Sequence, residues 1–339
     1  MPWLCRPAAA SMPPARIAPG SSIACLLLAL VSLGAASPAV AQSPALPPAS
    51  APEPITQIPA MPAQDLRRAA LGERLFQDRR LSHDNMRSCS SCHDTRTNGA
   101  SANARDKTPQ GEPLALNTPT IFNAGLNFRL NWEGNFRSLA RQAEQALRNP
   151  AIMASSVEEV LLKLRADPDV VRQFRDAYGR EPDRSALLDA IATYERSLVT
   201  PGSRFDRWLA GDADVITPEE LAGYQLFKSL GCISCHQGVN VGGNMFQQHG
   251  VFHPLASPQP EVLRVPSLRN VAVTPPYFHD GSATTLPEAV RAMGFAQLDR
   301  VLTDDQTTAI VAFLNTLTGT YLGKSVTRAA AALHGAAPQ

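Results

Sequence analysis

The feature that most constrains this chain is a five-residue motif, Cys-x-x-Cys-His, that occurs twice. It reads CSSCH at residues 89–93 and CISCH at residues 232–236. Each copy follows a similar stretch, GERLF at residues 72–76 and GYQLF at residues 223–227. We therefore expect two domains built on one plan, each with a helix that leads into its cysteine pair.

In this motif the two thiols add across the vinyl groups of a haem, and the histidine that follows is an axial ligand of the iron. Zinc ligation and a thioredoxin-like redox pair are the competing interpretations. A four-cysteine zinc site would leave the histidine beside each pair unexplained. The pairs are also too local for a disulfide framework in a chain of 339 residues. We therefore expect two covalently bound haem c groups, attached at Cys89, Cys92, Cys232 and Cys235, with His93 and His236 as iron ligands.

The N-terminus has the layout of a secretory signal peptide. Arg6 and Arg16 precede an apolar run at residues 23–33, and small residues continue to Ala41. A membrane anchor is the alternative, but the run is shorter than the roughly 20 residues that span a bilayer. Because c-type haem is attached outside the bacterial cytoplasm, we expect cleavage of residues 1–41 and a periplasmic protein.

The overall charge disfavours two classes of partner. The chain has 31 Lys and Arg residues against 30 Asp and Glu residues, which gives a formal net charge of +1. Such a chain has no basic field with which to hold nucleic acid or an anionic membrane surface. Its composition, 44% hydrophobic and 18% charged, is that of a globular protein.

Helix signals dominate the rest of the chain. Residues 42–62 are rich in Pro, Ala and Ser, which predicts a disordered linker. The period of apolar residues at 182–198 predicts an amphipathic helix, and the break that follows suggests a domain boundary near 200–215. No long alternating strand pattern occurs, so we expect a mainly α fold. Helix starts are predicted at Ser156 with Glu159, Thr217 with Glu220, Thr285 with Glu288, and Thr303 with Gln306.

Further motifs make the chain similar to a known family. They are NTPT at residues 117–120, WEG at 132–134, TPGSRFD at 200–206, RVPSLRN at 264–270 and PYFHDG at 276–281. With the two haem motifs, they resemble the bacterial dihaem cytochrome c peroxidase family, which includes methylamine-utilisation-type dihaem enzymes. The likeness covers about residues 63–320.

The resemblance implies two cytochrome-c-like domains. The N-terminal one, residues 63–205, would carry the peroxidatic haem, and the C-terminal one, residues 206–320, the electron-transfer haem; residues 321–339 would be a tail. Met293 falls at the family position of the second axial ligand of the electron-transfer haem, although periodicity alone suggests a core methionine. Trp132 matches the tryptophan between the two haems, a role compatible with simple aromatic packing.

The resemblance also implies a calcium ion between the domains. Asn117, Thr274 and Pro276 match the residues that help to hold it, the last two through backbone oxygens. Oxygen ligands suit this hard cation, although the same residues could simply form turns.

The chain departs from the family around the N-terminal haem. Pro109 stands where the family often has a distal histidine, and Ile152 stands where it has a glutamate, while Gln142 keeps a family glutamine. We therefore expect an open haem, unless another ligand reaches it, and slow peroxide cleavage, unless water or another acid supplies the proton. The candidate ligands are His83, Met86, His249 and His253, and the candidate acids are Glu133 and Glu144.

The activity that the resemblance implies is the reduction of hydrogen peroxide to water, with electrons from a small cytochrome c or cupredoxin. Gln142 and Trp132 would be its catalytic residues. One alternative is a dihaem oxidase that acts on a partner protein or organic substrate, but the methylamine-utilisation relative has a tyrosine where this chain has Met293. The other is a non-catalytic electron carrier or sensor, which Ile152 favours. A homodimer is a further expectation.

Overall fold

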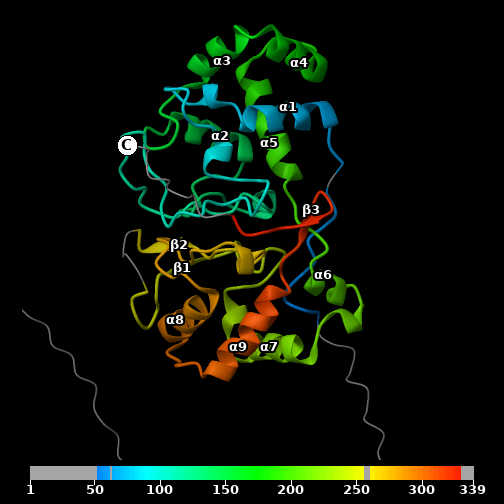
Figure 1. Cartoon of the computed structure of the whole chain (residues 1–339), viewed down its shortest axis with the longest axis vertical. Coiled ribbons are helices and arrows are strands. Elements are labelled where there is room, and N and C mark those ends of the chain that lie inside the picture. Colours follow the sequence, from blue (N-terminus) through cyan, green and yellow to red (C-terminus); the bar gives the residue numbers. More distant parts are fainter. Residues whose placement is uncertain (1–51, 62, 256–259, 330–339) are drawn as a thin grey trace, which may run out of the picture. The chain divides into compact units, whose positions relative to one another are not determined.

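The computed structural model describes residues 52–61, 63–255 and 260–329 and is mainly helical (Figure 1). The α-helices are α1 (Leu66–Phe76), α2 (Leu139–Arg148), α3 (Val157–Arg165), α4 (Pro168–Tyr178), α5 (Arg184–Ser197), α6 (Arg204–Leu209), α7 (Pro218–Ser229), α8 (Leu286–Leu298) and α9 (Asp304–Asn315). Short 3₁₀ turns are η1 (Arg79–Leu81), η2 (Cys89–Ser91), η3 (Ala124–Leu126), η4 (Ala213–Val215), η5 (Cys232–Ser234) and η6 (Val271–Val273). Two antiparallel strand pairs are β1 (Phe246–Gln248) with β2 (Val262–Arg264), and β3 (Thr320–Tyr321) with β4 (Lys324–Ser325).

The predicted helix starts are confirmed by their caps. The Ser156 hydroxyl accepts a hydrogen bond from the backbone N–H of Glu159 at the start of α3. Full capping boxes begin α7, α8 and α9, where a threonine and an acidic or amide residue satisfy each other's backbone N–H groups. These local bonds explain why the helices begin where the sequence predicts.

The helices form two lobes with separate hydrophobic cores. Helices α1–α5 bury one core cluster, and α6–α9 bury another around Phe205, Tyr224 and Phe313. In each lobe, a glycine lets two helices touch. A Cβ atom on Gly72 of α1 would lie 2.0 Å from the Ala190 carbonyl oxygen of α5, and one on Gly223 of α7 would lie 1.9 Å from the Ala309 carbonyl oxygen of α9. The shared plan predicted from the repeated motif therefore extends to the helix crossing that supports each cysteine turn.

Residues 52–61 differ from the linker predicted for residues 42–62. Ile55 is 1% exposed and forms a parallel bridge with Gly238 of the C-terminal lobe. The backbone N–H of Ile58 donates to Asp206, and the Thr56 carbonyl accepts from Arg269. The prediction of disorder is therefore wrong for this segment, which packs against the C-terminal lobe before the chain enters α1.

The C-terminal end of the described chain packs against the N-terminal lobe. The ring centre of Tyr321 lies 5.0 Å from that of Phe122, with the two rings tilted by 55°, and Val326 is buried against Phe76 and Tyr194 of the N-terminal lobe. The described part of the predicted tail, residues 321–329, is thus partly built into the opposite lobe. The domain boundary also moves, because Phe205, predicted as the last residue of the N-terminal domain, belongs to the core of the C-terminal lobe.

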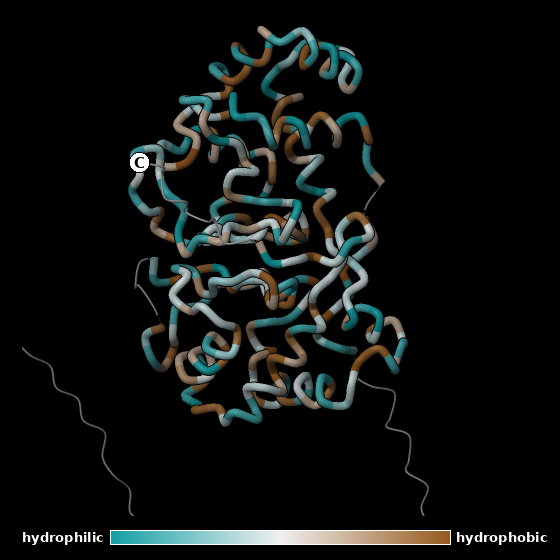
Figure 2. Tube along the Cα trace, in the orientation of Figure 1, coloured by the Kyte–Doolittle hydropathy of each residue, from teal (hydrophilic) through white to brown (hydrophobic). Residues whose placement is uncertain are grey.

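The predicted signal peptide, residues 1–41, lies outside the described residues. Within residues 52–61, 63–255 and 260–329, none of the helices has the length and apolar character needed to cross a membrane. Figure 2 shows hydrophobic and hydrophilic residues alternating along these helices, as expected where one face of a helix is buried and the other is exposed.

Candidate functional site

The two Cys-x-x-Cys-His motifs fold into matching turns. The first cysteine of each pair begins a 3₁₀ turn, η2 or η5; η5 follows α7 directly, whereas η1 and a loop lie between α1 and η2. The backbone N–H of His93 donates to the Cys89 carbonyl at 3.0 Å, and that of His236 donates to the Cys232 carbonyl at 3.0 Å. All four cysteines are free. The same backbone bond therefore holds each histidine in the same relation to its cysteine pair.

Both histidines present one ring nitrogen as a ligand. Nδ1 of His93 lies 3.3 Å from the Gly99 carbonyl, and Nδ1 of His236 lies 3.2 Å from the Val241 carbonyl. Because a carbonyl only accepts, Nδ1 carries the proton and Nε2 is left with its lone pair. Burial lowers the pKa of His93, and it lowers that of His236 to about 4, which keeps both imidazoles neutral.

The thiols do not fit the competing uses of cysteine. Burial raises the pKa of Cys232 to about 11, and burial with nearby Asp106 raises that of Cys92 to about 12. Redox-active cysteines and zinc ligands need the thiolate, which these environments disfavour. Among the described residues, no group of three or more His, Cys, Asp and Glu side chains is arranged to hold a metal ion. Neither a zinc site nor a redox cysteine pair is therefore supported.

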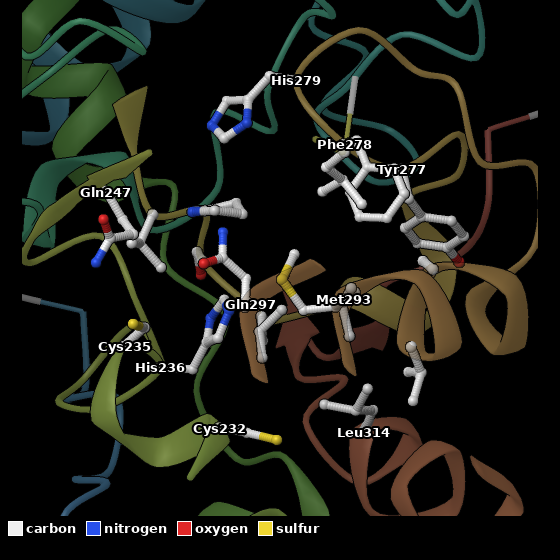
Figure 3. Close-up of a pocket in the computed structure, with 18 of the residues that line it drawn as sticks. Cys232, Cys235, His236, Gln247, Tyr277, Phe278, His279, Met293, Gln297 and Leu314 are labelled. Atoms are coloured by element: carbon white, nitrogen blue, oxygen red, sulfur yellow. The ribbon is translucent and has the colours of Figure 1, made fainter. Parts of the chain in front are cut away.

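A cavity brings the candidate ligands together; most of its wall comes from the C-terminal lobe and the rest from N-terminal residues such as Asn117 and Trp132, and we call it the C-terminal cavity. Cys232, Cys235, His236 and Met293 all line it, and the Met293 side chain points from α8 into the space beside His236 (Figure 3). The rest of this part of the wall is apolar, with leucines from α8 and α9 among its members. Nitrogen, thiol and thioether groups on an apolar wall fit a haem, whose flat ring needs hydrophobic contact and whose iron takes histidine and methionine.

Trp132 lies at the junction of the lobes. Its indole N–H donates to the Asn117 carbonyl at 2.8 Å, and its ring meets that of His279 edge to face at 4.4 Å. The guanidinium of Arg264 lies 5.3 Å from the centre of the indole ring. Trp132 is thus held by the N-terminal lobe and packed against side chains of the C-terminal lobe.

The three residues predicted to hold calcium also lie on this cavity wall. Asn117, Thr274 and Pro276 all line it. The Asn117 side-chain amide donates to the carbonyls of Asn103 and Ala104, at 3.1 and 2.9 Å. These bonds use the nitrogen of the amide, which no cation would bind, and calcium at this place stays a prediction.

Comparison with known proteins agrees with this geometry. A family model described as di-haem cytochrome c peroxidase matches residues 66–214, and a cytochrome c model matches residues 221–318. The cytochrome c551 peroxidase of Nitrosomonas europaea is 39% identical over 79% of this chain and 84% of that protein. This chain belongs to the di-haem cytochrome c peroxidase family. Its fold is mainly α with two cytochrome-c-like domains, and it is a peroxidase-like oxidoreductase that uses haem c.

Other members of the di-haem peroxidase family show its breadth. The cytochrome c peroxidase Ccp of Escherichia coli is 37% identical over 79% of this chain and 62% of that protein. The methylamine utilization protein MauG of Methylorubrum extorquens is 30% identical over 74% of this chain and 78% of that protein. Among solved structures, a MauG-like protein associated with microbial copper homeostasis superposes with a TM-score of 0.68 at 26% identity, covering 79% of this chain and 94% of that one.

In this di-haem peroxidase, one arginine bonds to both segments that differ from the family pattern, those of Ile152 and Pro109. The guanidinium of Arg87, two residues before Cys89, donates to the Ile152 carbonyl at 3.3 Å and to the carbonyl of Thr108, next to Pro109, at 2.7 Å. The structure thus brings the segments of Ile152 and Pro109 to the start of the haem motif. Gln142, on α2, is partly buried in the same lobe.

The other candidate ligands have partners elsewhere. His83 is bonded to Glu159 at 3.0 Å, and His253 to Asp299 at 2.8 Å, while Met86 is 65% exposed. His249 lines the C-terminal cavity rather than the N-terminal site. Each of these side chains is bonded to another residue, exposed, or part of the C-terminal cavity wall, and the open N-terminal haem stays a prediction.

The candidate acids are also engaged elsewhere. Glu133 is exposed and accepts a hydrogen bond from Asn135, and Glu144 is paired with Arg148 and Arg184. Glu133 therefore lies in solvent, and Glu144, although only 8% exposed, already pairs with two arginines. Two acids that sequence reasoning missed lie nearer the haem motif.

These two acids are Glu195 and Asp106. Glu195, on α5, is 4% exposed, and burial raises its pKa to about 8. It lies close enough to Cys89 to raise the pKa of that thiol, and its Oε2 has no hydrogen-bond partner among the described residues. Asp106 accepts from Ser101, Asn103 and Thr118 beside Cys92. The only sequence signal for Glu195 was an acid at a position where the helix period requires an apolar residue.

Proposed function

We propose that this chain is a periplasmic enzyme that reduces hydrogen peroxide to water, with electrons from a small cytochrome c or cupredoxin and two covalently attached haems. The observation that carries the proposal is the C-terminal cavity. There Met293, on α8, lies with His236, Cys232 and Cys235, which come from a turn far away in the sequence. A histidine and a thioether are the ligand pair that raises the potential of a haem and suits it to storing an electron.

The residues of the two lobes would have different roles in haem binding, electron transfer and peroxide reduction. When bound, the haem supplies the one-electron chemistry that the side chains lack. Cys89 and Cys92, like Cys232 and Cys235, would fix the two rings covalently. His93 and His236 would each offer Nε2 to an iron, because Nδ1 is already bonded to a backbone carbonyl. Trp132, packed between the lobes, would shorten the route of the electron, and Gln142 would help to orient the peroxide.

The proton supply would be unusual. Peroxide takes up two electrons and two protons to give two waters, and a placed acid normally moves the first proton. Ile152 has no proton to give. Water would therefore do this work slowly, or Glu195 would contribute to it from beside Cys89.

Ile152 also favours a second candidate function, that of an electron carrier or redox sensor without turnover. Stopped-flow spectroscopy of the reduced holoprotein mixed with hydrogen peroxide separates the two candidates. Oxidation of both haems within the mixing experiment, followed by turnover with a reduced cytochrome donor, is the expected result. Reduced haems that do not react with peroxide, together with stoichiometric oxidation of the reduced donor by the fully oxidised holoprotein, would assign the chain as a carrier.

A calcium ion would complete the junction of the lobes. Asn117, with the backbone oxygens of Thr274 and Pro276, would supply oxygen ligands to it. Dialysis against a chelator should slow electron transfer between the lobes, and readdition of calcium should restore the rate. An unchanged rate together with the absence of calcium by elemental analysis would remove the ion from the proposal.

A further inference from the structure

Two buried arginines in the segment 264–270 have opposite surroundings. Arg269 is 1% exposed and pairs with Asp206 at 2.9 Å. The nitrogen in this pair also donates to the Ser203 hydroxyl, and the other two nitrogens donate to the carbonyls of Val239 and Thr56. The chain therefore supplies both a counter-charge and acceptors for Arg269.

Arg264, five residues earlier, has far fewer partners. It is 5% exposed, and among the described residues its guanidinium makes a single hydrogen bond, from Nε to the Asn131 carbonyl at 3.1 Å. Among the described residues, no Asp or Glu side chain pairs with it. The face of Trp132 offers a cation–π contact, but this replaces a counter-charge only in part.

A buried guanidinium cannot escape this cost by losing its proton. Burial lowers the pKa of Arg264 only to about 10, so the side chain stays charged near neutral pH. A buried charge without a partner is strongly unfavourable. Because Arg264 lines the C-terminal cavity, the missing anion would come from whatever fills that cavity.

A second polar group on the same wall is also unsatisfied. His279 donates from Nε2 to the Arg264 carbonyl at 2.9 Å, so its Nδ1 accepts from Nε2–H of His249. This leaves Nδ1 of His249, which is buried and has no partner among the described residues. An adjacent carboxyl group would satisfy it, with one proton between the nitrogen and the oxygen.

We propose that Arg264, with Nδ1 of His249 on the same wall, binds a carboxylate side chain of the haem held at Cys232 and Cys235. The inference rests on the proposed function, since it requires haem in this cavity. Figure 3 shows His279, the link between the two groups, across the cavity from the cysteine turn. The carboxylate edge of the ring would then face Trp132, with Arg264 as its counter-charge.

The charge of Arg264 would also tune the iron. Reduction adds an electron to the haem, so a nearby cation favours Fe(II) over Fe(III). Replacing Arg264 with a neutral residue would remove this cation and expose the carboxylate, and both changes favour Fe(III). The haem potential therefore reports on the contact without any measurement of activity.

The test compares the holoprotein with Arg264→Gln, Arg264→Lys and Arg207→Gln. Arg207 is an exposed arginine of the same lobe, paired with Asp212, and controls for the loss of one charge. Haem content is measured first by intact mass. The potential of the C-terminal haem is then titrated at about pH 9, where a carboxyl without its counter-charge is ionised.

Arg264→Gln should raise the Fe(III):Fe(II) ratio at the wild-type midpoint about tenfold, which is about 59 mV for one electron. Arg264→Lys and Arg207→Gln should change it less than about twofold. A fully loaded Arg264→Gln protein with the wild-type potential would overturn the inference. So would a tenfold change in Arg264→Lys, which keeps the charge, and this variant decides the question if the glutamine variant does not fold.

A free carboxylate bound from solution is the other source of the same chemistry. Titrating the wild-type holoprotein with acetate should leave the potential unchanged if the haem carboxylate already occupies the subsite. A potential that shifts with acetate in the wild type but not in Arg264→Gln would reject the haem as the source. Absence of covalent haem at Cys232 and Cys235 would instead contradict the proposed function itself.

Discussion

Each lobe has an equivalent pair of crossing helices, α1 with α5 in the N-terminal lobe and α7 with α9 in the C-terminal lobe. The side chains that follow the crossing differ between the two lobes. Gly72 faces Ala190 in the N-terminal lobe, as Gly223 faces Ala309 in the C-terminal lobe. Four residues after each alanine comes a buried aromatic residue, Tyr194 or Phe313, and one residue later come Glu195 and Leu314. Leu314 lines the C-terminal cavity. By this correspondence, a buried acid occupies in one lobe the position that a leucine occupies in the other.

The difference between Glu195 and Leu314 would suit the two lobes to different tasks, proton supply in one and electron storage in the other, on the same arrangement of helices. An apolar wall with a thioether favours a haem that holds or passes an electron. A buried carboxyl next to a cysteine of the motif, as proposed above for Glu195, would be a proton source where charge changes. The predictions below, in order of decreasing effect, test whether the two lobes differ in this way.

The largest effect should come from removing a cysteine pair. Changing Cys89 and Cys92 to Ala should remove one haem, and changing Cys232 and Cys235 to Ala should remove the other, because each ring is attached within its own turn. Intact-mass measurement after expression in a host that matures cytochromes c checks this. Two haems retained in either variant would end the assignment of one ring to each lobe.

Restoring an acid to the N-terminal site should have the next largest effect. Ile152→Glu should speed the reaction with peroxide by up to roughly 10²- to 10⁴-fold, the contribution of a placed proton donor. Ile152→Gln has nearly the same shape without the acid, and it should leave the rate within about threefold of wild type. The rates come from stopped-flow mixing with peroxide.

The spin state and ligand binding of the N-terminal haem in the wild-type protein test the same prediction of an open site. With Pro109 and Ile152 near it, this haem should be high-spin and bind cyanide in the fully oxidised protein. An electron paramagnetic resonance spectrum with two six-coordinate low-spin haems would contradict the open site. A glutamate variant no faster than the glutamine variant would mean that the proton already has an efficient source.

A smaller and more local change is expected at the C-terminal haem. Met293→His should lower the potential of one haem by on the order of 0.1–0.3 V, within the roughly 0.8 V that axial ligands span. Imidazole stabilises Fe(III) relative to a thioether, so the direction is fixed. The other haem should keep its potential in the same redox titration. If the higher-potential haem does not move, Met293 is a packing residue.

The smallest effect concerns Glu195 and stability. Its folded pKa, about 8, lies above the ordinary value of 4.5, so the unfolded chain loses this proton first as the pH rises. The stability contributed by Glu195 is therefore complete below about pH 4.5 and is lost towards pH 8. Between pH 5 and 8, Glu195→Gln should gain on the order of 1–3 kcal/mol relative to wild type.

Denaturant unfolding of the holoprotein at the two pH values measures this gain. Glu144→Gln is the matched control in the same lobe, because Glu144 is a buried acid that is paired with two arginines, and the pH-dependent gain is expected in Glu195→Gln alone. Equal pH dependence in wild type and Glu195→Gln would show that the carboxyl of Glu195 is not the buried acid that distinguishes the lobes.

Much of this architecture is predictable because it depends on local bonds. The caps at Ser156, Thr217, Thr285 and Thr303 require only residues three positions apart. The repeated motif predicts the matching turns for the same reason. The turns at Cys89 and Cys232 can thus be predicted from short motifs that the sequence shows directly.

The parts that were missed depend on distant partners. Ile55 and Ile58 stand in a stretch rich in Pro and Ala, and that stretch is held by contacts with Gly238 and Asp206 of the C-terminal lobe. In the same way, Glu195 and Arg264 are ordinary charged residues in the sequence. Their burial, and the absence of a counter-charge for Arg264 among the described residues, arise from elements far along the chain.

The crossed ends of the chain have a consequence for how the molecule is made. The segment with Ile55 completes the lobe that is synthesised last, and the segment with Tyr321 and Val326 completes the lobe that is synthesised first. Because the chain is made from its N-terminus, the first lobe therefore lacks its final contacts until Tyr321 and Val326 are available to it. Completion of the polypeptide then closes both lobes together.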